Sequence, residues 1–427
     1  MNNTANAGTI PWQQTGELRA TKLPAATFGQ LMAEIKDLNQ KYNYDPILNA
    51  VKNKQPMMAT TDQFLPEVCV ALDLPYYFTP KIGADVCGGR KDAMEIIDAA
   101  NGLGLDGMTC DLHKVGMYLL QAGKLPIPTL ILTGNAPCDG CATVGEMMLN
   151  YKPWANLPRF SLDCPYSKDP ESMAYIARQM KAAVAFLQEA TGRKLDMDRL
   201  KKVCEESNKQ CRLMFDIQEL RRSKPCPLDW PWGMNTWRVG RQIMCGDLIG
   251  TDWLQRLYDL ALQQVRNKKG VEGVTEKIRY TWFDAAPVFG NIVFPRLEKD
   301  LGAVYVVDLY GFTPPLTPID TTNLDTICGS LAQRYMVETP MTRSAMSTAD
   351  VYCNDIVRLV REFSLDAVVM PGHVGHKDQS ASREIVKETC RGIGVPLLFL
   401  GCDCFDARPM PPDKVYDKMS TFFEVLG

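Results

Sequence analysis

The sequence has no apolar run long enough to cross a membrane and no block of basic residues. Its 427 residues carry a formal net charge of −3. This argues against nucleic acid as a partner, because nucleic-acid-binding proteins concentrate Lys and Arg on one surface. The first residues, MNNTANAGTIPW, contain neither the charged nor the apolar part of a signal peptide. We therefore expect a cytoplasmic protein that has neither nucleic acid nor a membrane as its partner.

A phosphate-binding loop is also absent, because no G-x-x-x-x-G-K-[ST] occurs. Any ATP that the protein's reaction uses must therefore be hydrolysed by another protein. One stretch at 102–107, GLGLDG, does match G-x-G-x-x-G. That fingerprint binds dinucleotides only where it leaves a strand and opens a helix. The preceding residues, RKDAMEIIDAAN, have helical periodicity, so we interpret the glycines as a helix end followed by a turn.

Cysteine is abundant, with 15 residues, whereas histidine is rare, with 3. Cytosolic cysteines stay mostly reduced, so this number indicates metal chemistry or an anaerobic host. Cys204 and Cys211 lie on the apolar stripe of an expected helix, which favours core positions. Eight other cysteines have no partner that the sequence indicates: Cys69, Cys87, Cys164, Cys226, Cys245, Cys328, Cys353 and Cys390.

Eight short apolar runs are typical of parallel strands that are buried on both faces, because they are continuous rather than alternating. They are residues 56–64, 75–80, 128–134, 159–164, 279–284, 303–311, 366–372 and 396–401. Helical patterns separate many of these runs, which indicates an α/β fold. We predict four parts: an N-terminal helical segment (1–55), a first α/β domain (56–166), a helical segment (167–275) and a second α/β domain (276–427).

The helical segment has clear start and stop signals. Asp169-Pro170 combines an N-cap with proline at the first helical position, and Gly192 ends the helix. Apolar residues between them recur at steps of three and four, which predicts a stripe that faces the core. The same pattern continues from Asp196 to about Ser223. The chain is thus expected to be two α/β halves joined by helices.

Chemically reactive side chains cluster at four expected strand ends, where ligands collect in open α/β sheets. The four groups are Cys110, Asp111 and His113; Cys138, Asp139 and Cys141; His373, His376, Lys377 and Asp378; and Cys402, Asp403, Cys404, Asp406 and Arg408. All three histidines of the chain belong to these groups. Thiols and imidazoles that converge on one crevice are what an iron or zinc site needs.

Two cysteine pairs have simpler interpretations. Cys138 and Cys141, in C-D-G-C, could form a redox pair or half of a zinc ribbon. A ribbon needs a second C-x-x-C at a suitable spacing, which the sequence lacks. A redox pair usually has a helix that begins at its first cysteine, within a smaller βαβ unit than this chain provides. Cys402 and Cys404 follow a strand as C-x-C and could equally be buried structure.

Several stretches resemble the family of 2-hydroxyacyl-CoA dehydratase and benzoyl-CoA reductase iron–sulfur subunits, from about Met57 to the C-terminus. TTDQFLPEVCVALDLPYYF (60–78) resembles the family's first strand and helix, and MTCDLHKVG (108–116) its first cluster-cysteine segment. LILTGNAPCDGC (130–141) resembles the second such segment. GVPLLFLGCDCFDAR (394–408) and YDKMSTFFEVLG (416–427) resemble the closing strand, the Asp-x-Arg turn and the last helix. The resemblance is greatest to the longer benzoyl-CoA reductase-type subunit.

This resemblance implies two Rossmann-like parallel-sheet domains joined by a helical segment, with a [4Fe–4S]-type cluster between the domains. It implies Cys110 and Cys138 as ligands of the cluster, and the family's third cysteine position falls on His376. The other candidates to complete the ligand set are Cys141, Cys402 and Cys404. The implied partners are a separate ATP-hydrolysing activator that donates single electrons, and either a paralogous cluster-bearing subunit or a second copy of the chain.

The implied activity is one-electron radical chemistry on a CoA thioester. The chain would be the cluster-bearing subunit of an ATP-dependent, low-potential acyl-CoA reductase. His113, Asp139, His373 and Lys377 are the polar candidates for catalysis near the cluster. The alternatives are a subunit of a 2-hydroxyacyl-CoA dehydratase or of a double-cubane reductase. A non-catalytic scaffold subunit is the alternative from another class, and iron and sulfide analysis would separate it from the enzymes.

Overall fold

The computed structural model describes residues 27–105, 109–309, 316–347, 349–373 and 375–426. These residues contain eight strands: β1 (Met58–Thr60), β2 (Tyr76–Phe78), β3 (Leu130–Gly134), β4 (Arg159–Leu162), β5 (Ile278–Trp282), β6 (Ala303–Asp308), β7 (Ala367–Met370) and β8 (Leu397–Phe399). Each strand coincides with one of the eight predicted runs, although β5 begins one residue before its run. The α/β prediction is confirmed.

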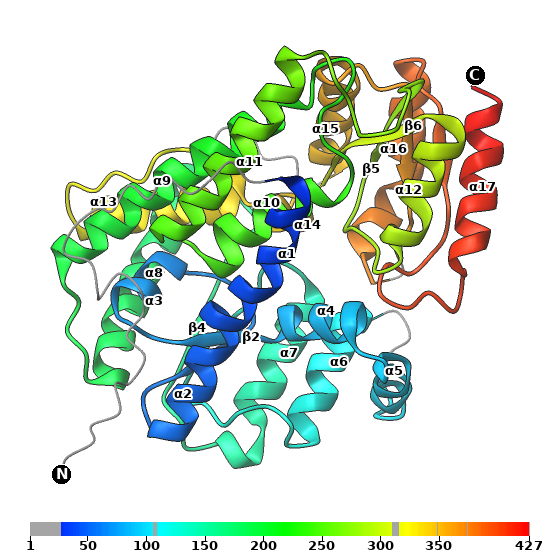
Figure 1. Ribbon diagram of the computed structural model, residues 1–427. Helices are drawn as coiled ribbons and strands as arrows, with labels where there is room; N and C mark the ends of the chain where they lie inside the picture. Colours follow the sequence, from blue (N-terminus) through cyan, green and yellow to red (C-terminus); the bar gives the residue numbers. More distant parts are fainter. Residues whose placement is uncertain (1–26, 106–108, 310–315, 348, 374, 427) are drawn as a thin grey trace, which may run out of the picture.

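The strands form two four-stranded parallel sheets, which lie in the lower and the upper right parts of Figure 1. Their orders are β2-β1-β3-β4 and β6-β5-β7-β8. Counted within each half of the chain, both orders read 2-1-3-4, so the two halves repeat one topology. The strand order reverses between β1 and β3 and again between β5 and β7. Open α/β sheets bind ligands at the carboxyl ends of the strands beside this reversal point.

Different helices cover the two faces of the first sheet. The face with Ala59 and Ile131 packs against α4 (Thr79–Gly89), α5 (Ala93–Asn101), α6 (Asp111–Gln121) and α7 (Asp139–Asn150). The face with Leu130 and Leu132 packs against α3 (Pro66–Ala71), α8 (Pro170–Thr191), α9 (Met197–Leu220) and α13 (Leu324–Gln333). Helix α13 comes from the second half of the chain but lies against α8 (Figure 1). It therefore ties the second half to the first sheet.

The second sheet is likewise covered on both faces. One face, with Tyr280 and Tyr305, packs against α12 (Gly290–Leu301) and α17 (Pro412–Glu424). The other, with Val304 and Val368, packs against α15 (Ala349–Glu362) and α16 (Lys377–Gly392). The remaining helical elements are α1 (Phe28–Asn39), η2 (Gln40–Tyr44), α2 (Asp45–Asn53), η3 (Lys152–Trp154), α10 (Pro231–Trp237), η4 (Arg238–Ile243), α11 (Leu248–Arg266), η5 (Arg334–Glu338) and α14 (Pro340–Ala345).

Helix α8 begins and ends where the sequence predicts. The Asp169 carboxylate accepts a hydrogen bond from the Ser172 N–H at 2.8 Å and caps the helix. Gly192 follows the helix with φ of 66°, the left-handed conformation that glycine adopts without a Cβ clash. In the next helix, α9, Cys204 and Cys211 are both buried. Their predicted core positions are confirmed.

The predicted helix end in GLGLDG is also confirmed. Helix α5 ends at Asn101, and Gly102 follows as its C-cap. Residues 106 and 107 of that stretch lie outside the described residues, as do residues 1–26 of the predicted N-terminal segment. Elements α1, η2 and α2 occupy residues 28–53 of the same segment.

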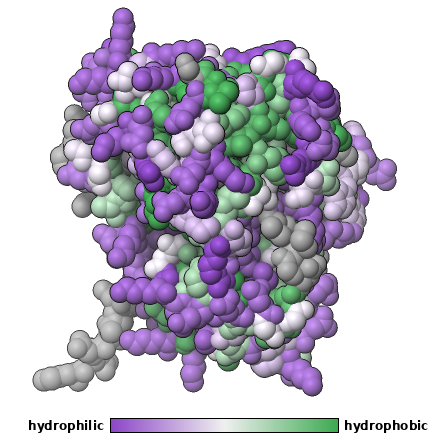
Figure 2. All heavy atoms as spheres, turned by 90° about the vertical axis from the view of Figure 1, so that its right-hand side faces the viewer, coloured by the Kyte–Doolittle hydropathy of each residue, from purple (hydrophilic) through white to green (hydrophobic). Residues whose placement is uncertain are grey.

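The face of the molecule shown in Figure 2 is mostly hydrophilic, and hydrophobic residues gather in its upper half. Helices α12 and α17 lie on this side of the molecule (Figure 1). Ile292 in α12 and Val425 after α17 are exposed. Within the described ranges, no helix is both long enough and apolar enough to cross a membrane.

Candidate metal centre

Residues that follow strands of both sheets line one cavity of about 380 Å³. Among them are Asp62 after β1, Cys138 after β3, Ala285 after β5 and His376 after β7. The first two follow the strands beside the reversal point of the first sheet, and the last two those of the second. Elements α10, η4 and η5 complete the wall. The cavity thus lies where α/β sheets bind ligands.

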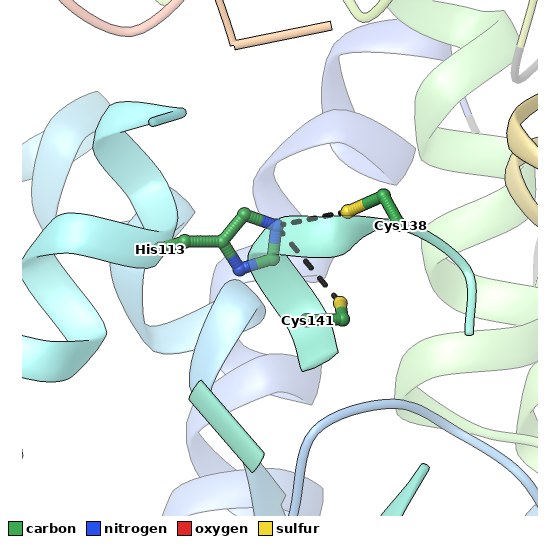
Figure 3. Close-up of side chains that lie close together, drawn as sticks. All are labelled: His113, Cys138 and Cys141. Atoms are coloured by element: carbon green, nitrogen blue, oxygen red, sulfur yellow. Dashed lines mark hydrogen bonds between the residues drawn. The ribbon is translucent and has the colours of Figure 1, made fainter. Parts of the chain in front are cut away.

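Three side chains of the first half point toward one another at this cavity (Figure 3). His113 lies in the first turn of α6, Cys138 directly precedes α7, and Cys141 lies in the first turn of α7. The Nε2 atom of His113 is 3.5 Å from the Sγ atom of Cys138 and 3.9 Å from that of Cys141. All three candidate ligand atoms lie within 4.8 Å of one another. They are close enough to bind the same metal ion.

The approach of the His113 ring to α7 depends on Gly140. A Cβ atom at this position would lie 2.5 Å from Cδ2 of His113, so any other residue would push the ring away. Helix α7 begins at the residue after Cys138. The C-D-G-C pair therefore has the helix that a redox pair usually has, although it lies in a larger architecture than a small βαβ unit. A helix N-terminus favours negative charge, which suits a thiolate at Cys138.

The two thiols of the C-D-G-C pair differ in acidity. A hydrogen bond from Cys141 and the charge of His113 outweigh burial, and they hold the pKa of Cys138 well below its usual range. The same hydrogen bond, together with burial, raises the pKa of Cys141 well above its usual range. Cys138 is therefore the more acidic of the two thiols beside the imidazole.

Cys110 lines the same cavity and directly precedes α6. Its Sγ atom is 3.2 Å from Nε2 of His373. Burial and the charge of Asp403 raise the pKa of this thiol well above its usual range. The predicted strand end before Cys110 is wrong, because the described part of the chain has no strand between β2 and β3. A Cβ atom at Gly375 would lie 2.4 Å from Cα of Cys110, so the loop after β7 packs directly on this cysteine.

The two histidines after β7 have different surroundings. His373 is fully buried, and the backbone N–H of Cys404 donates to its Nδ1 atom at 3.3 Å. His376 lines the cavity, with its Nδ1 atom 2.6 Å from Oδ1 of Asp284. Burial alone would lower the pKa of His376, but the charge of Asp284 and this hydrogen bond raise it to about 9. His376 is therefore mainly protonated at neutral pH.

The other predicted site residues are absent from the described lining of the cavity. Cys402 and Cys404 are fully buried in the core beside α17. Lys377 and Asp139 form an exposed ion pair at 2.5 Å between the N-terminal ends of α16 and α7. Exposed pairs of this kind contribute at most about 1 kcal/mol. The pair nevertheless connects the two halves of the molecule beside the site.

Sequence reasoning missed Asp62, Asp284 and Tyr335. Asp62 accepts a hydrogen bond from the Tyr335 hydroxyl at 2.7 Å, and burial raises the pKa of Asp62 to about 6. Asp62 lies two residues after strand β1, and Asp284 lies two residues after strand β5. An acidic residue directly after a predicted strand is a sign of a ligand site that the sequence did contain. Tyr335 lies in the π-helix η5. Short π-helices are common at functional sites, but the sequence gives no sign of this one.

Comparison with curated proteins finds subunits of CoA-thioester enzymes. The chain is 26% identical over 187 residues to the alpha subunit of lactoyl-CoA dehydratase of Anaerotignum propionicum, which is 38% of the chain and 43% of that protein. It is 22% identical over 176 residues to the (R)-phenyllactyl-CoA dehydratase alpha subunit of Clostridium sporogenes, which is 38% of the chain and 42% of that protein. The similarity therefore spans less than half the length of these two dehydratase subunits.

A longer alignment relates the chain to a benzoyl-CoA reductase subunit of Thauera aromatica. It covers 95% of the chain and 97% of that protein, at 21% identity over 447 residues. The family model for the 2-hydroxyglutaryl-CoA dehydratase D-component matches residues 63–426. This range includes every predicted site residue. Because the match covers most of the sequence, the chain belongs to the 2-hydroxyglutaryl-CoA dehydratase D-component family.

Proposed function

We propose that the chain is the cluster-bearing subunit of an ATP-dependent, low-potential acyl-CoA reductase of the benzoyl-CoA reductase type. The observation that supports this most is the convergence of three thiols and two imidazoles on one cavity, namely Cys110, Cys138, Cys141, His113 and His376. The alignment with a benzoyl-CoA reductase subunit over 95% of the chain supports it further. Thiolates and imidazoles are ligands of iron. The donor set therefore fits a [4Fe–4S]-type cluster.

Cys110 and Cys138 would hold the cluster, and His376 or Cys141 would complete its ligand set. Cys402 and Cys404 are weaker candidates, because they are buried away from the described lining of the cavity. When bound, such a cluster supplies low-potential electrons one at a time. The protein's own part is to position the acyl group and to keep water from the reacting atoms.

The polar residues near the site have different roles in this proposal. The His113 imidazole faces the thiols of Cys138 and Cys141 (Figure 3). His373 is absent from the described lining but contacts three residues that line the cavity, namely Cys110, His376 and Phe405. Asp139 and Lys377 lie at its edge as an ion pair. Asp62 lines the cavity and has a pKa of about 6, so it can exchange a proton near neutral pH.

The proposed reaction requires partners. The sequence has no phosphate-binding loop, so an electron transfer that ATP drives needs a separate activator that hydrolyses the nucleotide. We expect the second partner to be a paralogous cluster-bearing subunit or a second copy of the chain. The substrate would be an acyl-CoA thioester.

Iron and acid-labile sulfide analysis of anaerobically purified protein tests the proposal, together with an EPR spectrum of the reduced protein. We expect about four iron atoms and four sulfides per chain, with the spectrum of a reduced cluster. A variant that carries both Cys110→Ala and Cys138→Ala is the matched control and should lose the signal. A wild-type protein without iron and sulfide would contradict the proposal and favour a non-catalytic scaffold subunit.

A dehydratase subunit is the second candidate, because the family model and two of the similar proteins carry dehydratase names. A reductase consumes electrons with every turnover, whereas elimination of water leaves the electron count unchanged. Product analysis with benzoyl-CoA and lactoyl-CoA, in the presence of the activator, separates the two reactions. A double-cubane reductase subunit would differ from both by a higher content of iron and sulfide.

A further inference from the structure

We propose that His113, Cys138 and Cys141 form a self-contained three-ligand site for a single thiophilic divalent ion, with zinc and ferrous iron as the ions it would take. The site shares Cys138 with the proposed cluster, but it requires neither Cys110 nor His376. It therefore goes beyond the proposed function, and it can exist in a chain that carries no iron–sulfur cluster.

The two distances from the imidazole nitrogen to the sulfur atoms are close to those around a tetrahedral ion, and the two sulfur atoms lie within 4.8 Å of each other. Zinc binds sulfur at about 2.3 Å and imidazole nitrogen at about 2.0–2.1 Å, which places two ligand atoms of one ion roughly 3.5–3.8 Å apart. The Nε2 atom of His113 lies 3.5 Å and 3.9 Å from the two sulfur atoms. The side chains therefore need only small movements to bind one ion.

The three ligands are held in place by the packing of the first half. Helices α6 and α7 lie against each other, and the glycine at 140 gives the His113 ring the space it occupies. His113 is 5% exposed and Cys141 is 2% exposed. Side chains this well packed lose little freedom when they bind a metal, in contrast to an exposed group of the same residues.

The neighbouring candidates are held by other partners. The sulfur of Cys110 is 3.2 Å from Nε2 of His373. The Nδ1 atom of His376 is 2.6 Å from Asp284. Neither residue belongs to the group whose ligand atoms lie within 4.8 Å of one another. These contacts separate the three-ligand site from the rest of the cavity.

The fourth coordination position of such an ion would face the cavity, because all three ligands line it. Structural zinc sites have four protein ligands, whereas catalytic sites have three and leave one position for water or substrate. The site therefore has the ligand number of a catalytic centre. An oxygen or sulfur atom of a ligand in the cavity is the group that this position would take.

Cobalt(II) is the probe for this site, because it takes the place of zinc and its absorption spectrum reports geometry and thiolate ligation. The full-length chain is stripped of metal with a chelator, kept reduced with a phosphine and titrated without oxygen. We expect one ion per chain, with the visible bands of tetrahedral cobalt and a thiolate charge-transfer band. His113→Ala and Cys141→Ser should each weaken binding at least about 100-fold. Cys390→Ala, at a buried cysteine of α16 outside the described lining of the cavity, is the matched control and should bind within about threefold of the wild type. Cys110→Ala and His376→Ala should weaken binding much less than His113→Ala does.

One further variant keeps the test decisive if a ligand deletion destabilises the chain. Gly140→Ala keeps all three ligand residues but displaces the His113 ring, and it should weaken binding at least about tenfold. Circular dichroism checks that every variant is folded.

Three results would overturn the proposal. The first is a fully reduced wild-type chain that binds no cobalt. The second is a folded His113→Ala variant with wild-type affinity. The third is a loss of binding in Cys110→Ala or His376→Ala as large as that in His113→Ala. Failure of the proposed function is a different result, because it is read from iron and sulfide in the protein as purified.

Discussion

At the scale of single residues, the cysteines of the cavity differ in acidity because their surroundings differ. The hydrogen bond from Cys141 and the charge of His113 lower the pKa of Cys138, whereas burial and the charge of Asp403 raise the pKa of Cys110. The thiolate is the form that binds metals. The first metal ion to enter the cavity is therefore expected to bind Cys138, and Cys110 would follow once the charge of the metal offsets that of Asp403.

Single alanine substitutions test the two predicted cluster ligands. Cys110→Ala and Cys138→Ala should each abolish most of the bound iron, because a cluster that loses a thiolate is more exposed to hydrolysis and loss. The chain should stay folded apart from local loosening. Iron per chain and circular dichroism are the measurements, with Cys390→Ala as the control at a buried cysteine of α16. Full iron content in both variants would refute the assignment.

A second pair of substitutions tests His376 as a ligand of the cluster. His376→Cys should keep the cluster and lower its reduction potential, because a thiolate donates more negative charge to iron than an imidazole does. His376→Ala should change the EPR spectrum of the reduced cluster. A redox titration followed by EPR measures both effects. An unaltered spectrum in His376→Ala would exclude this residue and leave the third position to Cys141 or, as weaker candidates, Cys402 or Cys404.

At the scale of helices and strands, the sequence predicts which elements form better than it predicts which elements pack against each other. All eight strands were predictable, because a sheet covered on both faces needs continuous apolar runs. Sequence position alone cannot tell which sheet a helix covers: α13 belongs to the second half of the chain but packs on the first sheet. The same limit applies to the site. His113 and Cys138 are 25 residues apart, and their contact depends on a glycine whose role only the packing reveals.

A buried ion pair joins several of these elements. Glu67 of α3 is fully buried, with its Oε1 atom 2.7 Å from Arg241 of η4 and 3.5 Å from Arg334 of η5. The hydroxyl of Ser207 in α9 also donates to this atom at 2.7 Å. Burial alone would raise the pKa of Glu67, but the charges of the two arginines lower it from 4.5 to about 2. Both π-helices that line the cavity, η4 and η5, are thus held by one carboxylate.

Glu67→Gln should lower the free energy of unfolding by about 3 kcal/mol at pH 7, because it leaves two buried arginines without a counter-charge. A depressed pKa means that the stabilisation by Glu67 is fully present above pH 4.5 and is lost as the pH falls toward 2. The difference between variant and wild type should therefore shrink over that range. Guanidinium unfolding at several pH values measures this difference in the free energy of unfolding. Glu206→Gln is the control, because Glu206 of α9 is a carboxylate that forms an ion pair with Lys209. A difference that stays constant from pH 7 to pH 3 would contradict this assignment.

At the scale of the whole molecule, the site exists because two sheets of equal topology present their reversal points to one cavity. The first half of the chain contributes the thiols, and the second contributes His376 and Asp284. Contacts across the halves are close, since Gly375 packs on Cys110 and Lys377 pairs with Asp139. A ligand that binds in the cavity therefore contacts both halves, and any movement between them would change its surroundings.

The supply of electrons to the cavity also belongs to this scale, because we expect it to need a second protein. With no phosphate-binding loop in its 427 residues, the chain purified alone should not hydrolyse ATP. Adding an ATP-hydrolysing activator with a low-potential electron donor should make the EPR signal of the reduced cluster depend on ATP, since hydrolysis would drive each electron into the cavity. A non-hydrolysable ATP analogue is the control and should give no signal. ATPase activity that stays in constant ratio to the isolated chain through successive purification steps would refute the need for a partner.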